Sequence, residues 1–312
     1  MRTATIALLI VLATAASADA IDHKNLDEGR PLRLEDAYPI AHGEFAIEAG
    51  AGFTLQRRGA DRGLFPVELL YGPLPNLQVG IGTAFSTDPR EIDDRPKSGD
   101  LRLSALYNFN QETLKLPAFA AKLALDAPTG VNAHGFGVEA KGIVTKSIER
   151  LSLHLNAGYE FITSSRDDER DGRYKLAMGA SYPVGAPRFT RATLIADVFA
   201  EQSSGHSEPT TVGIGVGLRY QLTPRIVWDV GVGTEFAGPA ERRGFRSQLG
   251  CPSAFEMGHR RHVRGVALPR CTTRAHFRGE RFQWVTHLRS GPVVAASPSR
   301  HGTRRSNPEA RR

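Results

Sequence analysis

The chain has 312 residues, a formal net charge of +7 and a mean hydropathy of −0.29. That length accommodates one large all-β domain or two ordinary domains. A helical membrane protein would carry repeated apolar runs of about 18 residues or more, whereas only one long apolar run is present, at the very start. The composition therefore excludes a multi-span helical transporter.

The first twenty residues indicate a secretory signal peptide. Arg2 supplies a positive charge, residues 5–14 (TIALLIVLAT) form an apolar core, and Ala18-Asp19-Ala20 is a small-x-small cleavage site. The apolar core is too short for a membrane anchor. We therefore expect an exported protein with a signal peptide at 1–20 and a mature chain that begins near Ile21.

The positive charge is confined to the end of the chain. Residues 241–312 contain sixteen Arg, no Lys and four Glu, a net charge of +12, so the residues before them carry −5. Because the basicity belongs to one segment, it is not evidence for a nucleic-acid partner, and we expect none.

Residues 43–236 contain runs of about ten residues in which apolar and polar side chains alternate. In the first run, GEFAIEAGAGFTLQ, Phe45, Ile47 and Phe53 share one parity and Glu44 and Glu48 the other. This period of two predicts β-strands and excludes α-helices, whose period is 3.6. The eleven predicted strands are 43–56, 64–71, 77–85, 100–109, 118–126, 136–145, 151–161, 173–182, 191–201, 211–221 and 226–236.

Charged residues occupy only one face of these predicted strands. A charge that faces lipid near the middle of a bilayer costs about 2–4 kcal/mol, so a lipid-facing surface excludes charges. A soluble β-sandwich would show a similar split, but recurrent aromatic residues at strand ends, such as Tyr159 and Phe161, are typical of the interfacial girdles of membrane barrels. We therefore predict an all-β fold, an antiparallel transmembrane up-and-down β-barrel in contact with outer-membrane lipid.

The polar face of the strands would line the barrel lumen. We name as candidate lumen-lining residues Glu48, Arg102, Lys122, Glu139, Lys141, His154, Glu160, Arg173, Lys175, Asp197, Arg219 and Asp229. Because these residues carry both signs of charge, they are compatible with an open polar channel and with a lumen filled by salt bridges.

The joins between predicted strands alternate between short turns and longer polar loops, as in outer-membrane barrels. Bacterial single-chain barrels have even strand numbers, so a twelfth strand is expected after Phe236. The composition instead becomes Arg-rich. The sequence therefore predicts a barrel over 21–240 and an unstructured tail over 241–312, either a genuine basic arm or the product of a shifted reading frame.

The sequence contains no convincing catalytic or metal site. Ser152, His154 and Asn156 share one face of a predicted strand, but alternate residues of one strand are about 6.5–7 Å apart, too far for a catalytic triad. The pair His259 and His262 lacks further ligands for a metal such as zinc. We expect neither an enzyme nor a cofactor.

The chain resembles the outer-membrane transporter family linked to the meta-pathway of phenol degradation. The matching features are the signal peptide, the strand GEFAIEAGAGF, the loop Asp126-Ala127-Pro128-Thr129-Gly130, and the strand pair TVGIGVGLRYQLTPRIVWDVGVGTEF. The resemblance implies a barrel of about twelve strands that passes small hydrophobic or aromatic solutes. The alternative is a closed structural or adhesion barrel whose external loops bind a partner. The number of subunits stays open.

Overall fold

A computed structural model describes residues 23–56, 61–87, 97–131, 135–163, 165, 168–186, 190–239, 244–251 and 253–256 of the chain. Within these residues, no helix is long and apolar enough to cross a membrane. The strands are β1 (Glu44–Gln56), β2 (Arg62–Leu74), β3 (Leu77–Thr87), β4 (Lys97–Ser98), β5 (Leu101–Asn108), β6 (Ala118–Ala127), β7 (Gly137–Ile148), β8 (Leu151–Ile162), β9 (Gly172–Val184), β10 (Ala192–Glu201), β11 (Thr211–Thr223), β12 (Ile226–Ala237), β13 (Gly244–Gly250) and β14 (Ser253–Glu256).

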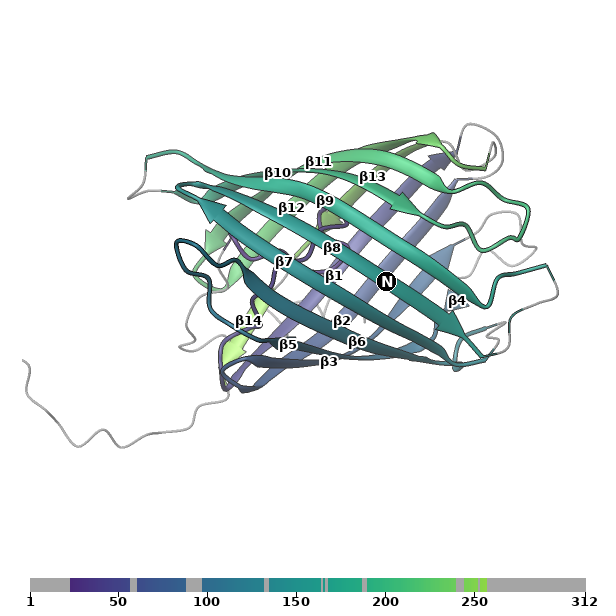
Figure 1. Cartoon of the computed structure of the whole chain (residues 1–312), viewed down its shortest axis with the longest axis horizontal. Coiled ribbons are helices and arrows are strands. Elements are labelled where there is room, and N and C mark those ends of the chain that lie inside the picture. Colours follow the sequence, from purple (N-terminus) through teal and green to yellow (C-terminus); the bar gives the residue numbers. More distant parts are fainter. Residues whose placement is uncertain are drawn as a thin grey trace, which may run out of the picture. The chain divides into compact units, whose positions relative to one another are not determined.

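These strands form one antiparallel sheet that closes on itself (Figure 1). Strands adjacent in the sequence pair with one another from β1 through β12, apart from the two-residue β4, which extends the partner of β3. Strand β13 pairs with both β12 and β1, and β14 continues along β1. With β13 and β14 as two parts of one strand, the described residues form a twelve-stranded barrel.

The predicted transmembrane barrel and its eleven strands are confirmed, with every strand end within three residues of its predicted position. The expected end of the barrel at residue 240 is wrong. Phe245 and Leu249 are exposed on the outer face, whereas Gln248 is buried inside, so the alternation continues into the Arg-rich region. Strands β12 and β1 would otherwise leave unpaired backbone groups in lipid, which is costly. Residues 257–312 lie outside the described residues.

The outer surface of the barrel is apolar. Leu123 of β6, Tyr159 of β8 and Trp228 of β12 are more than half exposed, although all three belong to hydrogen-bonded strands and not to loops. Among the described strand residues, Lys146 is the one charged residue of outward parity, and it pairs with Glu112 in the neighbouring turn. A soluble sandwich would bury its apolar face, so this arrangement identifies a membrane-spanning barrel.

The strand joins place the two ends of the barrel. The joins 75–76, 109–117, 149–150, 185–191 and 224–225 lie at the end where β1 begins, and the joins on the other end are mostly longer. In barrels of this kind the short turns face the periplasm and the long loops face outward. We use "periplasmic end" and "external end" in this sense.

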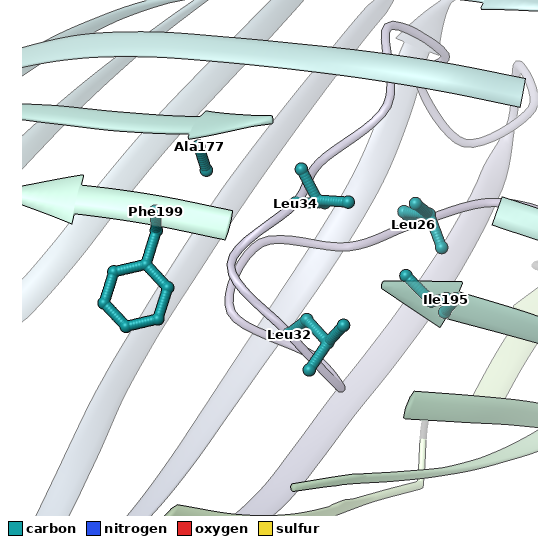
Figure 2. Close-up of a cluster of buried hydrophobic side chains, with 6 residues drawn as sticks. All are labelled: Leu26, Leu32, Leu34, Ala177, Ile195 and Phe199. Carbon is teal, nitrogen blue, oxygen red and sulfur yellow. The ribbon is translucent and has the colours of Figure 1, made fainter. Parts of the chain in front are cut away.

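The segment that precedes β1 lies inside the barrel (Figure 1). We call residues 23–42 the plug. Leu26, Leu32 and Leu34 of the plug are buried, and they form a cluster with side chains of β9 and β10 that includes Phe199 and Ile195 (Figure 2). The position of this segment inside the barrel is not predicted by the sequence, although each of its three leucines is 8% exposed or less.

Inward-facing glycines make room for the plug. A Cβ atom on Gly215 would lie 2.7 Å from the Leu32 side chain, and one on Gly217 would lie 2.8 Å from Pro31. A Cβ atom on Gly179 would lie 2.7 Å from Leu34. These distances are well below van der Waals contact. The plug can lie against β9 and β11 because glycine, which has no side chain, occupies these three positions.

Candidate functional site

The structure places the twelve candidate lumen residues on the inner side of the barrel wall. Nine of them are buried, namely Glu48, Lys122, Glu139, Lys141, His154, Glu160, Asp197, Arg219 and Asp229. The side chains of Arg102, Arg173 and Lys175 are 27–30% exposed. Five of the charged ones have ion pairs with residues of the plug, namely Glu48, Arg102, Lys122, Lys141 and Arg219. That solutes contact them stays a prediction.

Two lysines of the wall and two glutamates of the plug form a closed ring of ion pairs. The Lys122 ammonium lies 2.8 Å from Glu28 and 2.7 Å from Glu35. The Lys141 ammonium lies 2.5 Å from Glu28 and 3.0 Å from Glu35. Each carboxylate therefore bridges both ammonium groups, and Lys122, Lys141 and Glu35 are almost completely buried. Charge-assisted hydrogen bonds of this kind are the strong ones in proteins.

The arginines of the plug contact the opposite side of the wall. Arg30 pairs with Glu48 on β1. Arg33 pairs with Glu201 on β10, and its guanidinium also lies 3.9 Å from the centre of the Phe199 ring. The plug thus presents Glu28 and Glu35 to the lysines of β6 and β7 and its arginines to acids of β1 and β10, while its Asp27 pairs with Arg219 of β11 at 2.5 Å.

Polar side chains of the wall also bind the backbone of the plug. Asn156 accepts a hydrogen bond from the Glu35 amide (2.7 Å) and donates one to the Glu35 carbonyl (2.8 Å). Thr145 accepts from the amide of Ala37, and Asn108 donates to its carbonyl. Backbone groups without secondary structure need such partners when they are buried. These contacts fix the path of the plug as well as its charge.

Ser152, His154 and Asn156, which share one face of β8, have hydrogen-bond partners other than one another. The His154 ring contacts Thr145 at 3.2 Å and Ser181 at 3.0 Å. Asn156 binds the plug backbone, and the Ser152 hydroxyl pairs with that of Ser147 at 3.1 Å. Their contacts position the wall and the plug, and they do not join Ser152 to His154.

Burial and charge shift the pKa of two plug carboxyls in opposite directions. Burial raises the pKa of Glu28, but Lys122, Lys141 and Arg102 outweigh this effect and hold the pKa well below its usual value. For Asp36, burial raises the pKa to about 8, although the amides of Tyr38 and Leu26 donate to it. Glu28 is therefore ionised at neutral pH, whereas Asp36 in the docked plug keeps its proton up to a pH near its raised pKa of about 8.

The lumen is filled at the periplasmic end and hollow at the external end. Leu106, Ala118, Thr193 and Val227, all near the periplasmic ends of their strands, are 2% exposed or less. Two cavities of about 450 and 370 Å³ lie toward the external ends. The first is lined by charged residues that include Arg102, Asp126 and Arg173; the second is lined by Glu28, Arg33, Lys141 and Asn156 together with Arg246. Among the described residues, the lumen is therefore packed toward the periplasmic end and holds a vestibule toward the external end.

A closed twelve-stranded barrel with an apolar exterior and a charged interior defines the class of outer-membrane β-barrel channels. The sequence profile of the family described as "Putative MetA-pathway of phenol degradation" matches residues 34–249, and the chain belongs to that family. The match includes most of β13, in agreement with the closing strand.

Solved structures share the fold. An outer-membrane channel from Pseudomonas putida F1 is 16% identical, with a TM-score of 0.54; the similarity covers 74% of this chain and 100% of that one. The NanC porin is 9% identical, with a TM-score of 0.50, and the similarity covers 68% of this chain and 100% of that one. No curated protein sequence matches the chain.

Two features of the site were missed from the sequence. The first is the plug, whose leucines alternate irregularly with charges (NLDEGRPLRLED) and follow no strand or helix period. The second is Arg246, which lies on the unpredicted strand β13 and lines the smaller of the two cavities. One signal for the plug was present: Lys122 and Lys141 are direct cross-strand neighbours, and such like charges need an anion between them.

Proposed function

We propose that this protein is a passive, non-catalytic outer-membrane channel for small solutes, which conducts when the plug leaves the lumen. The observation that carries this proposal is the chemistry of the plug contacts. Beside the apolar cluster of its three leucines, the plug is held by ion pairs and hydrogen bonds to the wall, which water and ions can replace. Apolar packing would stabilise a permanently closed lumen at least as well, because replacing buried ion pairs by hydrophobic residues is often neutral or stabilising.

The position of the plug in the chain supports its release. It directly follows the expected cleavage site near Ile21, so its first residues would form a free end. Only the connection at Gly43 to β1 would hold the segment to the barrel. Release therefore needs no strand to break.

The lining of the vestibule bears on the solute. Four carboxylates and two arginines surround the larger cavity: Glu68, Asp100, Asp126, Glu160, Arg102 and Arg173. Such a surface favours small polar or ionised organic solutes over uncharged hydrocarbons. Aromatic compounds that carry a polar or charged group fit this proposal.

Displacing the plug tests the proposal. Gly217→Val would place side-chain atoms where Pro31 lies, whereas Gly142→Val is a control because a Cβ there would meet nothing closer than 3.9 Å. We expect Gly217→Val to conduct steadily in planar bilayers, and the native chain and Gly142→Val to open rarely. Trypsin cleavage after Arg33, which is followed by Leu34, would report the released plug.

The rival function is a closed barrel whose external loops bind a partner. Its support is the filled lumen and the contacts between the described residues of two external loops: Glu169 forms a bridge with Gly205, and the His206 amide donates to the Asp168 carbonyl. A Gly217→Val variant that releases its plug but carries no current would reject the channel and favour this rival.

A further inference from the structure

The lysine pair, Lys122 and Lys141, has a property that the closed barrel alone does not explain. The two residues are directly opposite each other on β6 and β7, and both side chains point into the lumen. Like charges in this position destabilise a sheet, and buried charges without partners are more costly still. Their close partners decide what the pair is built to hold.

Those partners come almost entirely from the plug. Within the described residues, Lys122 has ion pairs only with Glu28 and Glu35. Lys141 has one wall carboxylate, Glu139, at 3.8 Å, and Glu139 is closer to Arg102 and Lys175, each at 2.9 Å. Glu68 lines a small void with Lys122 but is engaged by Ser104 at 3.0 Å. Departure of the plug would therefore remove both ion pairs that the described residues give Lys122 and leave Lys141 with Glu139 at 3.8 Å, which it shares with Arg102 and Lys175.

The charge of the surrounding wall leads to the same conclusion. Strands β5 to β9 carry five inward cations and three inward carboxylates, which leaves a net charge of +2: Arg102, Lys122, Lys141, Arg173 and Lys175 against Asp126, Glu139 and Glu160. Glu28 and Glu35 of the plug neutralise this excess. The two plug carboxylates thus stand where a bound dianion would stand.

We propose that the lysine pair, with the Asn156 amide beside it, is a binding site for small dicarboxylates, and that Glu28 and Glu35 occupy this site when the channel is closed. The geometry fits two carboxylates a few bonds apart, because each plug carboxylate bridges both ammonium groups at 2.5–3.0 Å. Asn156 offers an amide donor that the Glu35 carbonyl now accepts. A dicarboxylate in the external medium competes with the plug for the same cations.

The site has a route from outside. The cavity of about 370 Å³ at the external end is lined by Glu28, Lys141 and Asn156, so it reaches the edge of the ring. That volume lies within the roughly 300–1,000 Å³ typical of small-molecule sites. The inference rests on the proposed function in one respect, namely that the plug is able to leave.

The test uses the full chain with Glu28→Gln and Glu35→Gln, which removes the competing carboxylates. Succinate is the probe, and acetate and the neutral succinamide are controls. Calorimetry in detergent micelles should show one succinate per barrel, bound roughly tenfold or more tightly than acetate, since a second charge-assisted contact is added. The affinity should fall as the salt concentration rises.

Substitutions in the wall identify the cations. Adding Lys122→Gln and Lys141→Gln should weaken succinate binding about tenfold or more. Lys146→Gln is the control, because this lysine has outward parity on β7 and pairs with Glu112 in the neighbouring turn, and it should leave binding nearly unchanged. Heat-shift electrophoresis checks that each variant has folded; if the double substitution does not fold, Lys141→Gln alone should give an intermediate loss.

The outcomes separate this site from the proposed channel. Succinate binding without any current would keep the site and reject the channel. Current in the Glu28→Gln/Glu35→Gln variant that succinate neither binds nor blocks would reject the site and keep the channel. Equal affinity with and without the lysine pair would also overturn the inference.

Discussion

Substituting Glu35→Gln should move the barrel from closed to open. Glu35 is 3% exposed and its carboxylate contacts both Lys122 and Lys141. Removing one member of a buried ion pair costs about 3–5 kcal/mol when the remaining charge stays buried. In this barrel the cost destabilises only the closed state, because release of the plug exposes the lysines to water. It therefore appears as a change in the closed-to-open ratio. At about 1.4 kcal/mol per factor of ten, the ratio should fall roughly a hundredfold or more.

The assay is the open fraction of single channels in planar bilayers, measured beside the rate of trypsin cleavage within the plug. Glu160→Gln is the matched control: its carboxylate is also in the lumen, but its partners Arg173 and Lys175 both belong to the wall. We expect Glu35→Gln to raise both quantities and Glu160→Gln to change neither. Equal open fractions for Glu35→Gln and the native chain would refute the reasoning, because the ring would then contribute nothing to closure.

Three further predictions follow from the barrel and the plug. Leu155→Arg, on the lipid-facing side of β8, should destabilise the barrel in lipid vesicles by about 2–4 kcal/mol, whereas Leu114→Arg in a fully exposed turn should have little effect; equal costs would contradict the outward placement of Leu155. A chain ending at residue 256 should fold and a chain ending at 243 should not, because only the first keeps β13 between β12 and β1. Heat-shift electrophoresis measures folding, and identical behaviour of the two chains would contradict closure by β13. Burial raises the pKa of Asp36 in the docked plug to about 8 from 3.8, so ionisation of this carboxyl favours release, and the open fraction should rise as the pH increases from about 4 to about 8. Asp36→Asn should reduce this pH dependence; the same pH profile in the variant and the native chain would contradict the role of Asp36.

The strands could be predicted because the membrane imposes a simple rule on them. Each strand must be apolar toward lipid along its whole length, so the period of two is visible in a single sequence from Phe45 to Phe236. The rule weakened at β13, which is seven residues long and is followed by Cys251 and Pro252 in an Arg-rich context. Its assignment depends on β12 and β1 as partners, and that pairing exists only in three dimensions.

The plug could not be predicted by periodicity, since it has no regular structure. Its contacts are also remote in the sequence: Glu35 and Lys122 are 87 positions apart, and Arg33 and Glu201 are 168 apart. What could have been inferred is a deficit of charge. Once strands 118–126 and 136–145 are aligned as a hairpin, Lys122 faces Lys141 and Glu139 is the one acid two positions away on the same face of the second strand, so the two cations call for a further counterion from elsewhere.

The central claim is that the plug alone closes the lumen, and a reversible lock tests it most directly. The Cβ of Pro31 lies 3.3 Å from the position of a Cβ on Gly217, close to the roughly 3.5–4.5 Å of a disulfide. Pro31→Cys with Gly217→Cys is therefore introduced into a chain in which Cys251 and Cys271 are replaced by Ser. Single-channel conductance is recorded with Glu35→Gln also present, first oxidised and then reduced. We predict no current from the oxidised protein and steady current after reduction, whereas equal current in both states would show that solutes pass without movement of the plug.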